Sequence, residues 1–565
     1  MRYCCLLVFC AFVCVARAQQ PPPVATTTVD DAKKDEGIPV TNALVRQKCG
    51  TCHRSDDQNR LTRISYRRTT PEGWEETIKR MVSLNDVKLD PSDAREIVRY
   101  LADRHGLAPE EAQPAAFEVE RRQIDYKYPG DKDTEDTCIK CHSMGRVISQ
   151  RRSKEEWELL IAMHRGYYPL VDFQAFRRGG PPPREPGPDG RPVDARHPMD
   201  KAIAHLSRAF PLATPEWSAW SATMRPPRLE GRWALTGYEP GKGPVFGIVT
   251  VTPQGDRGDF TTATTFTYSH GGQTVTRTGR AIVYTGFQWR GRSGDFREVL
   301  FVDRDWRHAR GRWFTGAYDE FGADVQLTRV GADPIVLGVS EPRIRSGVAN
   351  QEVRLFGVNL PAQPAAADFN FGPGVSVDRV VSSAPDRVVV SVSVARGATP
   401  GKRAVFVTGA TGEASIAVYD TIDFIKVLPQ AGLARVGGAN FPKQFQPFEA
   451  IAYANGPDGK SDTKDDIELG LVDASWSIEE FAATYDDDDK DFVGTIDAKS
   501  GLFTPNLDGP NPKRKHNANN YGDVSVVATY QPTAGEGTPR PLKARAHLLV
   551  TVPIYIKWDQ PEVAR

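Results

Sequence analysis

Two copies of the pattern Cys-x-x-Cys-His constrain this chain more than any other feature of its sequence. They are Cys49-Gly50-Thr51-Cys52-His53 and Cys138-Ile139-Lys140-Cys141-His142. A disulfide between cysteines so close together would not require a histidine after them, whereas covalent haem attachment uses all three side chains. The thiols form thioether bonds to the porphyrin, and the histidine becomes the proximal ligand of the iron. The sequence therefore predicts two covalently bound haem c groups, with His53 and His142 as proximal ligands.

The remaining four cysteines lie in the first eighteen residues, which have the form of a secretory signal peptide. Met1 and Arg2 are followed by an apolar run over residues 3–15 and by the small-x-small sequence Ala16-Arg17-Ala18. The alternative is an uncleaved membrane anchor, but the run is short of the roughly 20 residues that a membrane span needs. We therefore expect export of a mature chain that begins near residue 19.

An internal repeat after each motif indicates the sixth ligand of each iron. Each copy contains an arginine pair, a hydroxyl residue that starts a helix, and a tryptophan seven residues before a methionine or histidine. Seven residues make about two helical turns, so the tryptophan and the ligand share one helix face. The pairs are Trp74 with Met81 and Trp157 with His164. Met81 is thus predicted to ligate the first iron, and His164 the second.

Other side chains remain candidates for these positions. His105 is the alternative for the first haem. Met163 is next to His164, which rotates it by about 100° on a helix, so only one of the two can face the iron. Met144 is too close to His142 to reach the opposite side of the haem. The further alternatives for the second haem are His197, His205 and Met224. The arginine pairs are candidates to bind haem propionates; they are Arg67, Arg68, Arg151 and Arg152.

Composition excludes several other classes of protein. The chain has 72 basic and 72 acidic residues among 565, a mean hydropathy of −0.45, and no apolar stretch long enough to span a membrane after the leader. A nucleic-acid-binding protein and a multispan membrane protein are therefore not expected. The chain contains 49 Gly and 43 Pro, which favours many short strands and turns over a helix-rich enzyme.

A change in composition near residue 226 divides the chain. We expect an all-α dihaem cytochrome c domain over residues 19–225, with fused units at about 40–112 and 125–225. Alternating apolar and polar residues then predict three all-β domains. The first, over 226–332, is expected to be an antiparallel β-barrel, with a sandwich as the alternative, and the other two, over 333–420 and 421–565, are expected to be immunoglobulin-like sandwiches. Acidic segments at 458–466 and 486–491 are candidates for calcium, but without a helix-loop-helix around them solvated loops are favoured.

This order of parts resembles the alpha subunit family of quinohaemoprotein amine dehydrogenases, which are periplasmic enzymes. The resemblance rests on the two haem motifs, on the domain order, and on residues 94–102, 229–233 and 503–512. It implies a complex with a small gamma subunit, which bears a cysteine tryptophylquinone, and a β-propeller beta subunit. Primary amines are oxidised at the quinone, so no catalytic residue is expected on this chain. The chain would pass electrons to a soluble periplasmic carrier such as a cytochrome c or azurin.

Two other functions remain open. The chain could be a free-standing dihaem electron carrier whose β domains dock partners, or a dihaem peroxidase. A peroxidase needs an open or displaceable sixth position on one iron. The ligand candidates two turns beyond Trp74 and Trp157 argue against that function.

Overall fold

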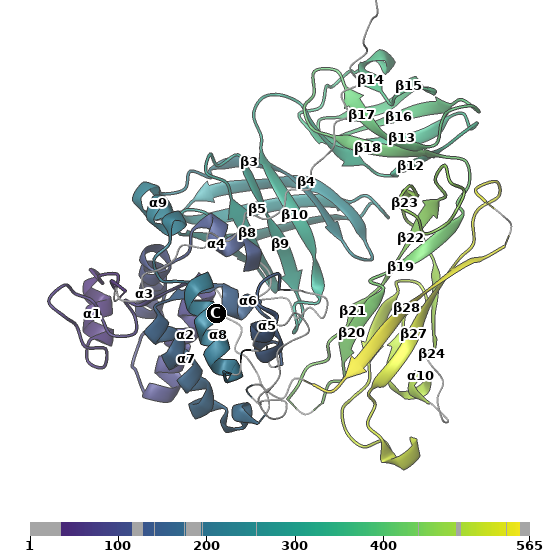
Figure 1. Ribbon diagram of the computed structural model, residues 1–565. Coiled ribbons are helices and arrows are strands. Elements are labelled where there is room, and N and C mark those ends of the chain that lie inside the picture. Colours follow the sequence, from purple (N-terminus) through teal and green to yellow (C-terminus); the bar gives the residue numbers. More distant parts are fainter. Residues whose placement is uncertain are drawn as a thin grey trace, which may run out of the picture.

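The computed structural model describes residues 35–115, 128–140, 142–173, 176, 194, 196–255, 257–438, 440–481, 488–537 and 540–553. The expected signal peptide, residues 1–18, lies outside these ranges. A helical N-terminal region lies against a β-barrel, and further β-sheets follow along the chain (Figure 1). None of the helices in the described ranges has the length and apolar character that a membrane span requires.

The helices of the N-terminal region begin at residues that suit helix starts. Thr70 and Ser153 cap α2 and α7, and their side chains accept hydrogen bonds from the backbone N–H groups of Gly73 and Glu156. The helices are α1 (Ala43–Cys49), α2 (Pro71–Asn85), α3 (Pro91–Arg104), α4 (Pro109–Ala112), α5 (Lys132–Cys138), α6 (Gly145–Ile148), α7 (Lys154–Tyr167), α8 (Pro198–Ala209) and α9 (Pro215–Thr223). The helical fold expected for this part of the chain is confirmed.

The repeated residues make the same contacts in both halves of this region. Each repeat tryptophan is buried, and its indole N–H donates to a backbone carbonyl after a later helix. Trp74 donates to His105 at 3.0 Å, and Trp157 donates to Phe210 at 3.2 Å. The halves meet where strand β1 (Arg67–Thr69) pairs antiparallel with β2 (Gln150–Arg152). The internal repeat of the sequence is therefore also a repeat of structure.

A closed antiparallel barrel follows, as predicted. Its eight strands pair in the order β10-β3-β4-β5-β6-β7-β8-β9. Alternate side chains fill the interior, where Trp233, Trp289 and Trp313 belong to one buried apolar cluster. The strands are β3 (Gly231–Glu239), β4 (Gly243–Pro253), β5 (Asp259–Tyr268), β6 (Thr274–Tyr284), β7 (Gln288–Ser293), β8 (Phe296–Val302), β9 (His308–Thr315) and β10 (Phe321–Arg329).

The next unit contains two four-stranded sheets around one buried cluster that includes Val353, Val390 and Val418. The sheets have the orders β11-β13-β16-β15 and β12-β18-β17-β14. The strands are β11 (Ile335–Val339), β12 (Arg343–Arg345), β13 (Gln351–Val358), β14 (Phe369–Asn370), β15 (Val375–Ala384), β16 (Arg387–Val394), β17 (Gly401–Val407) and β18 (Ala414–Tyr419). The all-β fold is confirmed, and the immunoglobulin-like assignment stays a prediction.

The last unit is also all-β apart from the short helix α10 (Asp489–Phe492). Its sheets have the orders β19-β22-β23, β20-β28-β27-β24 and β21-β26-β25. The strands are β19 (Phe424–Leu428), β20 (Ala431–Arg435), β21 (Gln446–Pro447), β22 (Glu449–Ala454), β23 (Ile467–Leu471), β24 (Ser475–Glu480), β25 (Gly494–Ile496), β26 (Leu502–Pro505), β27 (Gly522–Tyr530) and β28 (Leu542–Thr551). Here too the immunoglobulin-like class stays a prediction.

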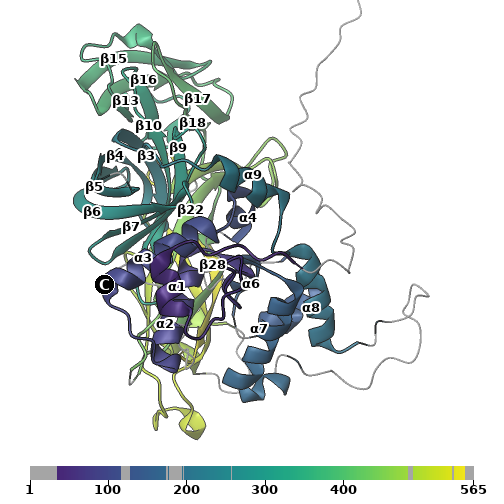
Figure 2. The same ribbon diagram turned by 90° about the vertical axis from the view of Figure 1, so that its left-hand side faces the viewer.

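Polar contacts fix the helical region on the barrel, and the second view shows the two parts adjacent (Figure 2). Glu72 of α2 forms a buried ion pair with Arg290 of β7. The carboxylate of Asp103, next to the end of α3, accepts from the backbone N–H of Thr285 at 2.6 Å. The Trp220 indole of α9 donates to the carbonyl of Thr285 at 2.9 Å. The barrel therefore holds helices from both halves of the N-terminal region.

Candidate functional site

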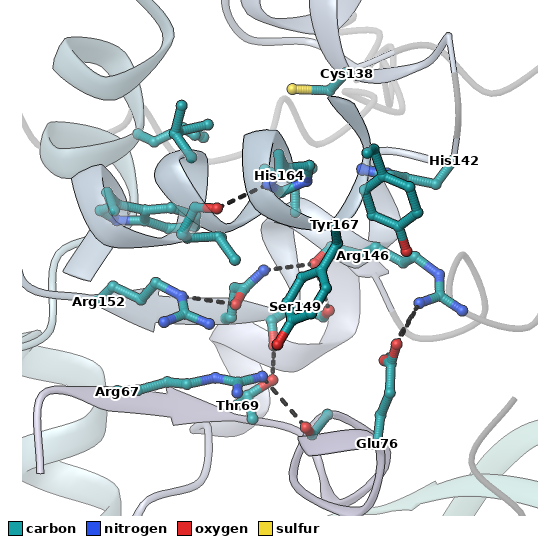
Figure 3. Close-up of a pocket in the computed structure, with 18 of the residues that line it drawn as sticks. Arg67, Thr69, Glu76, Cys138, His142, Arg146, Ser149, Arg152, His164 and Tyr167 are labelled. Carbon is teal, nitrogen blue, oxygen red and sulfur yellow. Dashed lines mark hydrogen bonds and ion pairs between the residues drawn. The ribbon is translucent and has the colours of Figure 1, made fainter. Parts of the chain in front are cut away.

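A cavity of about 390 Å³ lies between the two halves of the helical region (Figure 3). Cys138, His142 and His164 line it from the second half, and Arg67 and Thr69 of β1 line it from the first. Its apolar wall is made by Val147, Trp157, Leu160, Ile161, Val171, Phe176 and Leu206. The volume falls within the range of cofactor pockets, and the lining joins apolar surface to a few polar groups.

His142 and His164 face each other across this cavity. Their ring centroids are 6.4 Å apart and the ring planes are inclined by 45°. The His142 Nδ1–H donates to the carbonyl of Ser143 at 2.9 Å, and the His164 Nδ1–H donates to the carbonyl of Leu160 at 2.8 Å. A carbonyl can only accept, so in each ring Nε2 is the nitrogen whose lone pair a metal ion would take. Two metal–nitrogen bonds of about 2 Å, added to the distance from Nε2 to the centre of each ring, would account for the separation of the two ring centroids.

Burial also sets the protonation state of these histidines. It lowers the pKa of His142 to about 4, and it lowers the pKa of His164 as well. Both imidazoles are therefore neutral near pH 7, which is the form that ligates a metal. Cys138 ends α5 at the same cavity, and Cys141 lies outside the described residues. The donor set that the structure describes here fits a haem iron.

The first motif follows α1, which ends at Cys49. Burial raises the pKa of the Cys49 thiol to about 11, as expected for a cysteine that packs against apolar side chains. The His53 Nδ1–H donates to the carbonyl of Thr62 at 2.8 Å, which again leaves Nε2 as the ligating nitrogen. Burial lowers the pKa of His53. The first histidine is thus oriented by a backbone carbonyl as the second one is.

The two candidates for the sixth ligand of the first haem iron have different surroundings. Met81 lies on α2, two turns beyond Trp74, and is half-buried, with the Asn85 side-chain amide 3.8 Å from its sulfur. His105 is fully buried between Trp74 and Tyr100, with ring centroids 6.1 and 6.2 Å away. Neither of its ring nitrogens has a hydrogen-bond partner within the described structure. Burial, with a smaller contribution from Arg68, lowers its pKa to about 3. Both residues therefore remain candidates.

Four family models match the chain in consecutive stretches. The model described as "Quinohemoprotein amine dehydrogenase A, alpha subunit, haem binding" matches residues 40–180. Models of alpha subunit domains II, III and IV match residues 226–330, 333–420 and 425–563. Together they cover most of the chain in the order of the family's domains. The chain belongs to this alpha subunit family. It is therefore the haem-bearing subunit of an amine dehydrogenase, which is an oxidoreductase of several chains.

Other comparisons add no functional argument for this alpha subunit. No curated protein matches the sequence. A redesigned β-barrel is 15% identical with a TM-score of 0.16, covering 18% of this chain and 92% of its own. The titin domains z1z2 in complex with telethonin are 12% identical with a TM-score of 0.13, covering 40% of this chain and 100% of their own. Mouse protocadherin-24 EC1-3 is 11% identical with a TM-score of 0.15, covering 43% of this chain and 79% of its own.

The other ligand candidates of the alpha subunit have different contacts. The Met163 sulfur lies 3.5 Å from the Arg63 guanidinium. His197 caps α8 by accepting from the N–H of Met199 at 3.3 Å. The His205 Nε2 lies 2.9 Å from the hydroxyl of Tyr128. None of these candidates is among the residues that line the cavity, nor is Met224, which lies beside the barrel residue Gly286.

The arginine pairs divide into two kinds. Arg68 binds Glu111 with two hydrogen bonds of 2.7 and 2.9 Å, and the Arg151 Nε is 3.2 Å from the same carboxylate. Burial opposes ionisation of Glu111, but these arginines outweigh it and lower the pKa of the carboxyl to about 2. Arg67 and Arg152 instead line the cavity. The sequence did not single out Glu111, Arg80 or Arg146. The pairing of β1 with β2 places Arg68 and Arg151 together around Glu111 and brings Arg80 of the first half to the cavity. Arg146 lies four residues after His142 in the second half and lines the cavity as well.

Hydrogen bonds and an ion pair hold the first acidic segment, residues 458–466, in place. The Asp462 carboxylate accepts from the Lys426 ammonium at 2.6 Å, and Asp466 accepts from the backbone N–H of Thr463 at 2.7 Å. Part of the second segment, residues 486–487, lies outside the described ranges. Among the residues that the structure covers, no group of three or more His, Cys, Asp or Glu side chains could hold a metal ion.

Proposed function

We propose that this subunit carries two covalent haem c groups and passes electrons from a quinone-bearing partner to an external carrier. The observation that carries the proposal is the opposition of His142 and His164 across a cavity that Cys138 also lines. Such a pair would hold one haem iron between its two imidazoles. When bound, the haems supply one-electron transfer between ferric and ferrous iron.

Each predicted site residue has one role in this proposal. Thioether bonds use Cys49, Cys52, Cys138 and Cys141. The proximal ligands are His53 and His142, and the sixth ligands are Met81 and His164. The protein keeps the imidazoles neutral by burial, orients them through backbone carbonyls, and surrounds the second haem with apolar side chains that exclude water. Hydrogen bonds to a ligand and apolar surroundings of this kind also tune a haem's reduction potential.

The amine chemistry takes place on another chain under this proposal. Primary amines are oxidised at a cysteine tryptophylquinone on the gamma subunit, a β-propeller beta subunit helps enclose it, and a soluble cytochrome c or azurin takes the electrons away. The signal peptide sends the subunit to the periplasm, and the last two β units are immunoglobulin-like. The family assignment supports this arrangement. A sixth ligand as close as His164 favours electron transfer over peroxidase chemistry at the second haem.

The test is anaerobic mixing of the assembled complex with a primary amine. We expect the absorbance of ferrous haem c to appear, and the isolated alpha subunit to remain oxidised under the same conditions. Reduction of the isolated subunit by amine alone would contradict the proposal, and so would failure of the complex to reduce its haems. The isolated subunit reduced by dithionite serves as the control for haem competence.

A further inference from the structure

Four arginines line the cavity of the second haem, and they come from both halves of the helical region. Arg146 and Arg152 belong to the second half, at α6 and β2. Arg67 and Arg80 belong to the first half, at β1 and α2. Figure 3 shows Arg67 and Arg152 on neighbouring strands below His164, and Arg146 beside Glu76. One wall of the cavity is therefore strongly positive.

The arginines of the second half are paired with carboxylates. Arg146 is 3.1 Å from Glu76, and Arg152 is 3.4 Å from Glu156. Within the described part of the chain, neither Arg67 nor Arg80 has a carboxylate within 4.0 Å. Two of the four arginines of the cavity wall therefore have no carboxylate of the described chain in ion-pair contact.

The hydrogen bonding of Arg67 and Arg80 is also incomplete. Arg67 is 9% exposed and donates to the Thr77 hydroxyl at 2.5 Å and to the Gly73 carbonyl at 3.3 Å. Arg80 donates to the same hydroxyl at 3.2 Å. The Nε atoms of both side chains are buried and have no partner in the described structure. Burial, with repulsion by Arg152 and Arg80, lowers the pKa of Arg67 well below its ordinary value and outweighs the attraction of the more distant carboxylates of Glu76 and Glu156. A buried guanidinium such as that of Arg67, and the buried Nε of the half-buried Arg80, are stabilised by an anion that accepts their hydrogen bonds.

We propose that Arg67 and Arg80 of the first half bind the propionate carboxylates of the second haem. The inference rests on the proposed function, because it assumes that a haem occupies this cavity. A carboxylate accepts the short, charge-assisted hydrogen bonds that a guanidinium donates. The two residues of the first arginine pair then have separate tasks. Arg68 binds Glu111 between the halves, and Arg67 faces the haem of the other half.

This binding has a consequence for the redox chemistry. Positive charge beside a haem favours the reduced form, because reduction removes one positive charge from the iron centre. The first half of the region would therefore raise the midpoint potential of the second haem. The second haem site is complete only when both halves are folded together.

The test uses the full subunit with both haems and the variants Arg67→Gln and Arg80→Gln. Glutamine is the residue that the second repeat has at the position of Arg67, namely Gln150. Lys79→Gln is the matched control, because Lys79 is next to Arg80 on α2, carries the same charge, and pairs with Glu75 away from the cavity. Midpoint potentials come from spectroelectrochemical titration, and the component that Cys138→Ala, Cys141→Ala removes identifies the second haem.

We expect Arg67→Gln and Arg80→Gln, the two cavity variants, each to make the second haem harder to reduce. At a fixed ambient potential, the ratio of its oxidised to its reduced form should rise about tenfold relative to the wild-type protein. The propionate bending modes of the resonance Raman spectrum should change as well, and Lys79→Gln should change neither. Arg67→Lys keeps the charge and should retain most of the wild-type ratio. If Arg67→Gln does not fold, as judged by circular dichroism, Arg80→Gln decides alone. Unchanged potentials and Raman modes in the cavity variants would overturn this inference, whereas absence of haem from the wild-type protein would overturn the proposed function.

Discussion

Arg68 and Arg151 lie directly opposite each other in the antiparallel pair of β1 and β2, and both bind Glu111. They are equivalent residues of the internal repeat, so the local symmetry axis of the two halves passes between them. Glu111 has no such symmetry and lies closer to Arg68, at 2.7 Å, than to Arg151, at 3.2 Å. One buried carboxylate therefore joins the two halves at the centre of the helical region.

Replacement of Glu111 by glutamine should destabilise the helical region by about 3 kcal/mol at pH 7, because it leaves buried arginines without their anion. The carboxyl has an ordinary pKa of 4.5 and a pKa of about 2 in the folded protein. A lowered folded pKa gives stability that is complete above pH 4.5 and is lost as the pH falls toward 2. The difference between wild type and variant should therefore shrink over that range. Urea unfolding followed by haem absorbance measures it.

Glu110→Gln is the matched control for that experiment. Glu110 is the preceding residue of α4 and its side chain is exposed, so its replacement should change stability little. Equal urea concentrations at the unfolding midpoints of Glu111→Gln and Glu110→Gln at pH 7 would show that Glu111 does not hold the halves together.

The purified mature protein should carry two haems that resist acid extraction, because each Cys-x-x-Cys-His motif is predicted to attach one haem covalently. The double variant Cys138→Ala, Cys141→Ala should retain one, and Cys49→Ala, Cys52→Ala should retain the other. The pyridine haemochrome spectrum gives the haem count for each protein. A well-folded, haem-free wild-type protein from a strain that matures cytochromes c would contradict the assignment of both motifs.

The fold and the site differ in how much of them the sequence could predict. The barrel follows from alternating apolar residues and turn glycines, which are local signals, and the structure confirms it. The opposition of His142 and His164 follows from a motif and a helical period, which are also local. Glu111 could not be found in this way, because its importance depends on Arg68 and Arg151, which lie 43 residues before it and 40 residues after it in the sequence. The sequence also could not assign Arg80 to the cavity, because Arg80 lines it only when the two halves of the helical region pair.

The sixth ligand of the first haem can be decided by two alanine variants. If Met81 is the ligand, the oxidised wild-type protein has the weak near-infrared band of sulfur ligation, Met81→Ala removes it, and His105→Ala leaves it intact. Methionine ligation raises a haem's potential relative to two histidines, so the two haems should also titrate separately in the wild-type protein. A band that persists in Met81→Ala would exclude Met81. His164→Ala serves as the control, because loss of a nitrogen ligand from the other haem should not affect the band.

The direction of electron flow should follow from these ligands. A first haem held by His53 and Met81 would have the higher potential, and downhill transfer would then run from the quinone to the second haem and on to the first. The cavity proposed for the second haem is partly walled by β1 and α2 of the first half. In stopped-flow reduction of the assembled complex by amine, loss of the second haem should abolish reduction of the first. Loss of the first haem should still permit reduction of the second. The opposite pattern would reverse the route and show that burial or local charge outweighs ligand type in setting the two potentials.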